Sequence, residues 1–381
     1  MMDQKGINKI AIVVPKALKS QAGMFWSKCR EVAPGLNIIM GQPKWFEVHD
    51  ARPQAYCQMI EGQVYSLKPD ILVIFTNKVE DELYAVLKRL TMIKCPMLSQ
   101  IITAQKILNK PDKYASFASK ILVQMATKLG AKPWAVKIPP KNLMVAGFDT
   151  YHKKEGDRQA KSFGAFTASL DPLFGRYHSQ CLSHTAGEEI SQNLPIMFAA
   201  ALKAYKQVNN AYPQRIIFYR DGVGEGQLEE VRETEIKAIK KLFEQSDETK
   251  DIKLTFIIVS KRIHTRFFTK TKPSKNPDSG TVVDDVATLP ERYDFYLISQ
   301  SVGVGTVNPT SYNIIHDESG WPPDRIQQLT YKLTHLYYNW PGTVRVPAPC
   351  RYAHKLADLV GGSLKDEVHP ELIQQNVLYY L

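Results

Sequence analysis

One strand, turn and helix could carry either of two chemistries. Residues 215–231 read RIIFYRDGVGEGQLEEV, an apolar run that ends in Asp221 and is followed by three glycines at alternate positions. This outline fits a loop that cradles phosphate, and it also fits a strand that delivers a carboxylate to a metal ion. A dinucleotide fingerprint needs glycine where Gln227 stands, and a Walker loop needs lysine after Gly226, so both phosphate-loop patterns fail. The pattern therefore favours the carboxylate.

A second acidic residue lies in an apolar run, Asp149 in VAGFDTY. A carboxylate buried in a strand costs free energy unless something pairs with it. Two carboxylates on neighbouring strands would suit a divalent cation, and a two-metal nuclease holds two such ions about 3.5–4 Å apart. That chemistry needs three or four ligands. Glu189 and His354 are candidates, but their local patterns do not distinguish them, and Asp221 alone could equally be a turn former or helix cap.

A second group of polar and basic residues occurs earlier in the chain. Tyr84 and Lys88 are four residues apart in one expected helix, and Gln124 and Lys128 repeat that spacing in another. Residues at i and i+4 share a helix face, so two helices could aim hydroxyl, amide and ammonium groups at one anion. Spacing alone favours the plainer interpretation, which is solvated helix faces.

Composition narrows the class of protein. The 381 residues are 44% hydrophobic and 23% charged, which is typical of a globular chain with room for two domains. The net charge of +11 favours polyanionic partners, of which nucleic acid is the commonest. The five cysteines show no CxxC spacing, which predicts reduced thiols of a cytosolic or nuclear protein. Since no apolar run approaches the roughly 20 residues of a membrane span, and the N-terminus has no signal-peptide pattern, we expect a soluble intracellular protein.

The elements that must position these residues fall into two groups. In the first, strand-like runs alternate with helical patterns, which predicts a small parallel α/β sheet with Gly130 as a helix stop. In the second, a mixed sheet with helices on its faces is expected, and Pro195 marks a helix start. The expected strands of this second group lie at 143–151, 161–170, 176–184, 215–221, 253–261, 293–301 and 310–315, with a helix at 322–339.

Several long motifs resemble a known family. VAGFDTYH, FYRDGVGEGQLEEV, GTVVD, YYNWPGTVRVPAPCRYAHKLADL and the terminal NVLYYL resemble the PIWI domain of Argonaute-family proteins, most closely the PIWI clade. The resemblance runs through the whole chain. It implies a Rossmann-like, parallel-sheet MID domain over residues 1–135 and a ribonuclease H-like, mixed-sheet PIWI domain over residues 136–381. Nothing in the sequence resembles the family's N-terminal and PAZ domains, so we expect a MID–PIWI module.

The resemblance implies two sets of site residues. The family's catalytic Asp, Glu, Asp and His match Asp149, Glu189, Asp221 and His354, with Glu188 an open alternative to Glu189; Asp149, Asp221 and His354 would bind Mg²⁺ or Mn²⁺. The positions that bind the guide's 5′ phosphate match Tyr84, Lys88, Gln100, Gln124, Lys128 and Leu381. Gln124 replaces a lysine of other Argonautes, so the resemblance further implies a second divalent ion held by Gln124 and the carboxylate of Leu381.

The implied function is small-RNA-guided silencing. We expect the chain to bind the 5′-phosphorylated end of a guide RNA of the PIWI-interacting class and to act as an Mg-dependent endoribonuclease on complementary target RNA. A guide-loaded scaffold that recruits silencing-pathway proteins without cleaving is the alternative. A nucleotide-cofactor enzyme that uses the loop at 222–226 is the third hypothesis. The resemblance also implies a monomer that resides in the cytoplasm or in germ granules, with nuclear residence left open.

Overall fold

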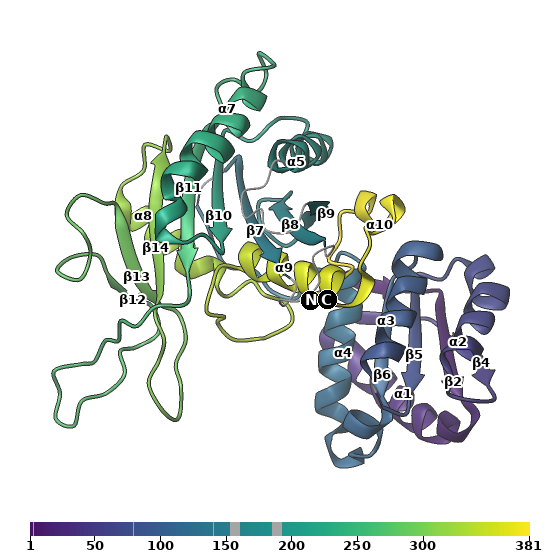
Figure 1. The fold of residues 1–381 in the computed structure, drawn as a ribbon. Helices are drawn as coiled ribbons and strands as arrows, with labels where there is room; N and C mark the ends of the chain where they lie inside the picture. The colour runs from purple at the N-terminus through teal and green to yellow at the C-terminus, as the bar shows by residue number, and fades with distance from the viewer. Residues whose placement is uncertain (3, 79, 140, 153–160, 185–192) are drawn as a thin grey trace. The chain divides into compact units, whose positions relative to one another are not determined.

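The computed structural model describes residues 1–381 except 3, 79, 140, 153–160 and 185–192. The chain forms two compact units (Figure 1). The first contains Met1–Trp134 together with Asp358–Leu381, and the second contains Ala135–Ala357.

The first unit is built on a four-stranded parallel sheet in the order β4-β2-β5-β6, and a separate parallel pair joins β1 and β3. Its strands are β1 (Lys5–Ile7), β2 (Ile10–Pro15), β3 (Ile38–Met40), β4 (Pro43–Val48), β5 (Ile71–Thr76) and β6 (Ser99–Thr103). Its helices are α1 (Lys19–Val32), α2 (Pro53–Met59), α3 (Asp81–Arg89), α4 (Tyr114–Lys128) and α10 (Pro370–Gln374). Every residue of β2 and β5 is buried, as expected of central parallel strands covered on both faces. The predicted parallel sheet is therefore confirmed.

The C-terminal segment belongs to the first unit, although the sequence-based boundary groups it with residues 136–357. Arg89 Nε donates to the carbonyl of Ser363 at 3.0 Å, and the amide of His369 donates to the carbonyl of Met92 at 2.9 Å. Leu372 of α10 is fully buried. Order along the chain cannot reveal this packing, because it joins residues more than two hundred positions apart, as the 274-residue separation of Arg89 and Ser363 shows.

The second unit is built on an eight-stranded mixed sheet in the order β12-β13-β14-β11-β10-β7-β8-β9. Its strands are β7 (Leu143–Tyr151), β8 (Ser162–Ser169), β9 (Tyr177–His184), β10 (Arg215–Asp221), β11 (Lys253–Ser260), β12 (Thr281–Val283), β13 (Asp294–Ile298) and β14 (Thr310–Asp317). Its helices are α5 (Leu194–Asn209), α6 (Leu228–Val231), α7 (Lys237–Phe243), α8 (Pro323–Leu333) and α9 (Ala348–Asp358). The mixed sheet and the helix start beside Pro195 are confirmed. The helix expected over 322–339 ends early, because the chain leaves Leu333 in tight turns, with the amide of Leu336 bonded to the carbonyl of Leu333 at 3.2 Å.

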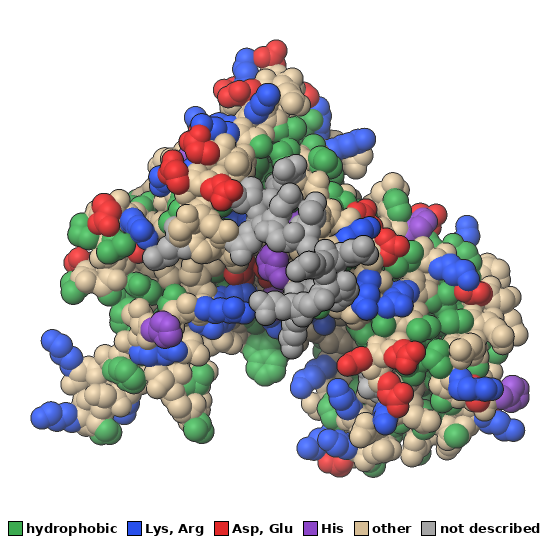
Figure 2. Space-filling view, viewed as in Figure 1, with side chains coloured by type: hydrophobic (Ala, Val, Ile, Leu, Met, Phe, Trp, Pro, Cys, Tyr) green, Lys and Arg blue, Asp and Glu red, His purple; other side chains and the backbone are tan. Residues whose placement is uncertain are grey.

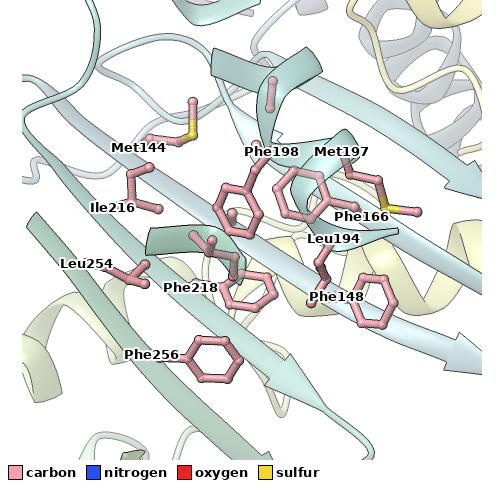
Figure 3. Packing of buried hydrophobic residues seen from close by; sticks show 14 of the residues in the cluster. Met144, Phe148, Phe166, Leu194, Met197, Phe198, Ile216, Phe218, Leu254 and Phe256 are labelled. Carbon is pink, nitrogen blue, oxygen red and sulfur yellow. The ribbon is translucent and has the colours of Figure 1, made fainter. Parts of the chain in front are cut away.

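The two faces of the central strands have different tasks. β7, β10 and β11 are mutually parallel, and alternate residues of each point to opposite faces. One face carries Met144, Phe148, Phe218 and Phe256 into the main hydrophobic core, where the centre of the Phe218 ring lies 5.1 Å from that of Phe198 of α5 (Figure 3). The residues between them point to the opposite face, where buried residues such as Val145 and Ile217 precede Asp149 and Asp221.

No described helix of either unit is long and apolar enough to cross a membrane.

Candidate active site and anion-binding pocket

Strand register brings the two predicted aspartates together. Arg220 of β10 lies opposite Phe148 of β7, so the residues that follow them, Asp221 and Asp149, point to the same face of neighbouring parallel strands. Asp221 is the last residue of β10, and Asp149 lies two residues before the end of β7. Gly222 turns the chain there with a φ of +85°, a conformation that favours glycine, and a Cβ on it would lie 3.8 Å from Asp149 Oδ1. The two carboxylates therefore face one small region at the carboxyl ends of these strands.

A glycine in the middle of β7 admits the helix that supplies histidine. A Cβ on Gly147 would lie 2.5 Å from the carbonyl carbon of Pro349, closer than real Cβ atoms come, so α9 can rest here only against bare backbone. This contact anchors the start of α9, and one to two turns later His354 Nδ1 lies 2.6 Å from Asp149 Oδ2. The structure thus joins three of the four predicted catalytic residues. Glu188 and Glu189 lie outside the described residues.

A buried ion pair fixes the end of β10. The Arg220 side chain is 1% exposed, its guanidinium lies 4.7 Å from the Phe148 ring, and its Nε is 3.2 Å from Glu235 Oε2. Glu235 is fully buried in the helical segment after Gly222. Because a buried charge requires its partner, this pair locks the turn that presents Asp221.

Lys261 is a site residue that sequence reasoning missed. Its Nζ lies 2.5 Å from Asp221 Oδ2. Asp221 pairs in register with Val259, and Lys261 comes two residues later on the same face; this placement depends on the register of β11 against β10, which the sequence alone does not show. Burial raises the pKa of Asp221 and the nearby Asp149 carboxylate raises it further, while the Lys261 ammonium opposes the rise. Burial by itself would lower the pKa of Lys261, but the Asp221 and Asp149 carboxylates raise it above its ordinary value.

The donor set suits a hard divalent cation. Asp149 and Asp221 offer carboxylate oxygens and His354 offers an imidazole, the ligand types that Mg²⁺ and Mn²⁺ accept. The mutual repulsion of two carboxylates in a buried place also calls for a cation. Within the described parts of the chain, no three His, Cys, Asp or Glu side chains form a ready-made metal cluster. The described candidate ligands are two carboxylates and one imidazole: Asp221 pairs with Lys261, and Asp149 pairs with His354 and accepts from the Thr150 amide at 2.8 Å.

A small cationic cavity adjoins these residues. It measures about 260 Å³ and is lined by Lys261, Gln300, Val344, Arg345, Val346, Arg351 and His354. Arg345 is held by hydrogen bonds to the carbonyls of Pro309, at 2.9 Å, and Lys261. Basic and acidic side chains intermingle over the face shown in Figure 2, so the net charge is not gathered into one patch there. The cavity concentrates positive charge locally.

The predicted anion site lies within the first unit. Lys88 Nζ of α3 donates to Ser99 Oγ at 3.2 Å, and Lys128 Nζ of α4 donates to the Ser99 carbonyl at 2.8 Å. Lys128 Nζ also donates to Gln100 Oε1 at 2.8 Å, and Gln100 Nε2 donates to Gln124 Oε1 at 3.3 Å. The two ammonium groups, 4% and 1% exposed as residues, therefore meet around one residue of β6. Sequence reasoning did not single out Ser99.

Tyr84 lies near Lys88, and Leu381 is placed only within the same unit. Lys88 Nζ lies 5.9 Å from the centre of the Tyr84 ring. Leu381 is buried in the same unit, 8% exposed, and the nearby Val377 packs against the end of α4, since a Cβ on Gly130 would lie 3.5 Å from its Cγ1. The residues whose spacing suggested solvated helix faces instead belong to a buried, hydrogen-bonded polar cluster around Lys88 and Lys128.

Comparison with known proteins identifies the family. The Piwi domain family model matches residues 70–365. The chain is 40% identical to Protein aubergine of Drosophila melanogaster, over 98% of this chain and 43% of that protein, and 40% identical to Piwi-like protein Siwi of Bombyx mori, over 98% and 41%. The crystal structure of Drosophila Piwi matches 99% of this chain and 51% of that one, with a TM-score of 0.90 and 34% identity. The chain thus spans about two-fifths of the length of these curated relatives. It belongs to the Piwi clade of the Argonaute family.

Proposed function

We propose that this chain holds the 5′-phosphorylated end of a small guide RNA and cleaves the target RNA that pairs with it. The observation that carries the proposal is the convergence of Asp149, Asp221 and His354 at the ends of two parallel strands, because nothing in the fold alone requires two buried carboxylates there. Guide recognition is supported by the buried pocket around Lys88 and Lys128.

Different side chains of this chain would have different roles in cleavage. Asp149 and Asp221 would hold Mg²⁺ or Mn²⁺ with His354, and Glu189 would complete the set. A bound divalent pair supplies an activated water and stabilises the leaving oxygen of the phosphodiester. Arg345 and Arg351 beside His354 would bind the strand's phosphates, since guanidinium groups match phosphate oxygens in geometry and charge. The target would be selected by base pairing with the guide, and the protein would contact mainly the backbone.

Guide binding can be tested first and without catalysis. We expect a short single-stranded RNA with a 5′ phosphate to bind about 100-fold more tightly than its 5′-hydroxyl counterpart, since two charge-assisted hydrogen bonds contribute about 1.5–3 kcal/mol each. Mg²⁺ should strengthen binding of the phosphorylated RNA if Gln124 and the Leu381 carboxylate share an ion at the phosphate. Lys128→Gln should remove most of the phosphate preference. Lys120→Gln on the exposed face of the same helix is the matched control and should keep it. Equal binding of both RNAs would remove the support for this pocket.

Cleavage distinguishes the proposal from a non-cleaving scaffold that recruits silencing factors. The protein loaded with a guide should cut a complementary RNA opposite the guide in Mg²⁺, and Asp221→Asn should abolish the cut while leaving guide binding unchanged. The scaffold function is favoured instead if the wild-type protein binds guide and target tightly without cutting the target. In that case Asp221→Asn should silence as well as the wild type does.

A further inference from the structure

The metal-binding face already contains a cation that belongs to the chain. Lys261 Nζ lies 2.5 Å from Asp221 Oδ2, an oxygen that a metal ion at this site would also use. The Asp221 side chain is 4% exposed, whereas most ion pairs among the described residues join exposed groups, such as Lys206 with Glu248 at 40% and 60%. A single ammonium therefore neutralises a nearly buried carboxylate beside a second one.

The Lys261 side chain is free to change partners while its backbone stays fixed. Its carbonyl accepts a hydrogen bond from Arg345, and the preceding residues pair with Asp221 and Tyr219 in the parallel sheet. From this anchor a flexible four-carbon stem carries the charge, and the side chain is 30% exposed. The same side chain lines the 260 Å³ cavity with Arg345, Arg351 and His354.

We propose that Lys261 is the resident counter-ion of the metal site and exchanges Asp221 for a nucleic-acid phosphate in the adjoining cavity. This inference rests on the proposed metal-binding role of Asp149 and Asp221. When Lys261 contacts Asp221, it competes with a divalent cation for the same oxygen. When a phosphodiester in the cavity attracts the ammonium, the competition ends, so strand binding and metal binding strengthen each other. Such coupling is reciprocal by thermodynamic necessity.

The test is a titration of the whole chain with Mn²⁺, followed by electron paramagnetic resonance of the free ion, with and without a saturating single-stranded RNA that carries a 5′ hydroxyl, so that no ion is held at a guide 5′ phosphate beside Gln124 and Leu381. We expect the RNA to lower the wild-type Kd for Mn²⁺ by about tenfold, as the removal of one competing unit charge would do. Lys261→Met should bind Mn²⁺ about tenfold more tightly than wild type without RNA, and RNA should add little. Lys253→Met, which changes an exposed lysine at the start of β11, the strand that precedes Lys261, should behave as wild type.

Three outcomes distinguish a failure of this inference from a failure of the proposed function. If Asp221→Asn binds Mn²⁺ as wild type does, the metal site itself is misplaced and the proposed function fails. If Asp221→Asn loses Mn²⁺ but Lys261→Met binds it no more tightly than wild type, Lys261 is only a structural partner and this inference is overturned. Should Lys261→Met fail to fold, the wild-type titration still decides, because absence of any RNA effect on the Kd for Mn²⁺ contradicts the exchange.

Discussion

Individual residues decide the geometry of the site, and Gly147 has the narrowest tolerance. The start of α9 lies directly on its backbone, and His354 depends on that helix for its position. A methyl group at position 147 must push Pro349 and Cys350 away, and both backbones are held within packed elements.

We expect Gly147→Ala to lower the free energy of unfolding by about 1–3 kcal/mol, the usual cost of overpacking, and to abolish target cleavage by displacing His354. Guide 5′-end binding should survive, because that pocket belongs to the other unit. Chemical denaturation and a cleavage assay measure the two effects. Gly226→Ala is the control, since a Cβ there meets nothing within 4 Å. Normal cleavage by Gly147→Ala would show that α9 can shift without moving its histidine.

The residues of the site differ in how far sequence could predict them. Asp149 and Asp221 stood out because an acidic residue in an apolar strand needs a reason to be there, and the structure gives both the same surroundings. His354 sits on a helix whose approach depends on a glycine two hundred residues earlier, so its role came from the family resemblance. Lys261 was missed because a lysine at a strand's end is ordinarily solvated, and only the register with β10 brings it onto Asp221.

The carboxylate of Glu318 connects separate elements of the second unit. Glu318 follows β14 and accepts hydrogen bonds from Lys240 of α7 at 2.8 and 2.9 Å and from the Leu254 amide of β11 at 3.1 Å. Burial alone would raise the pKa of Glu318, but these hydrogen bonds and the Lys240 charge lower it below its ordinary value. A carboxyl group whose pKa is lowered by folding stabilises the fold above its unfolded pKa, near 4.3, and loses that contribution as the pH falls through the folded pKa.

Glu318→Gln should therefore destabilise the protein by about 1–2 kcal/mol at pH 7, and the difference from wild type should shrink as the pH falls below about 4. Urea unfolding at several pH values measures this. Glu248→Gln provides the comparison, because its ion pair with Lys206 is exposed and should contribute less than about 1 kcal/mol. If the difference in free energy of unfolding between wild type and Glu318→Gln stays constant down to pH 3, the loss of stability comes from packing and not from the charge of Glu318.

The elements that sequence predicted well share one property. β2, β5, β7, β10 and β11 are largely apolar runs that lie at the centres of the two sheets and pair in parallel with one another there, and such runs are visible without context. β4 was not predicted, because only two of its residues are buried and its apolar pattern is interrupted by lysine and glutamate. A strand at the edge of a sheet needs fewer buried apolar residues than a central strand, so its sequence pattern is harder to recognise.

The whole molecule contains a discontinuous first unit. Residues 358–381 complete a unit whose other part ends at Trp134, and Leu372 of α10 is fully buried in it. The first unit is therefore not one continuous stretch of sequence. A terminal segment can pack on any surface that its apolar residues fit, wherever that surface lies in the sequence.

We expect Leu372→Ala to cost about 2–5 kcal/mol of stability, as other buried leucines do, and to act on the first unit. Hydrogen exchange of amides in β5 and β6 should become faster, and exchange in β7 and β10 should change less. Leu254→Ala, in the core of the second unit, should produce the reverse pattern. If Leu372→Ala accelerated exchange only in β7 and β10, the C-terminal segment would stabilise the second unit instead.

This discontinuity has a consequence for biosynthesis. The ribosome makes the α4 end of the first unit, then all of Ala135–Ala357, and only then the segment that closes the first unit. At about 5–20 residues per second, the earlier part waits for roughly tens of seconds with an apolar surface uncovered. Chaperones have that interval in which to bind it, and a messenger truncated within the second unit would yield a first unit that is never closed. Completion of the first unit therefore reports that translation has passed through the second.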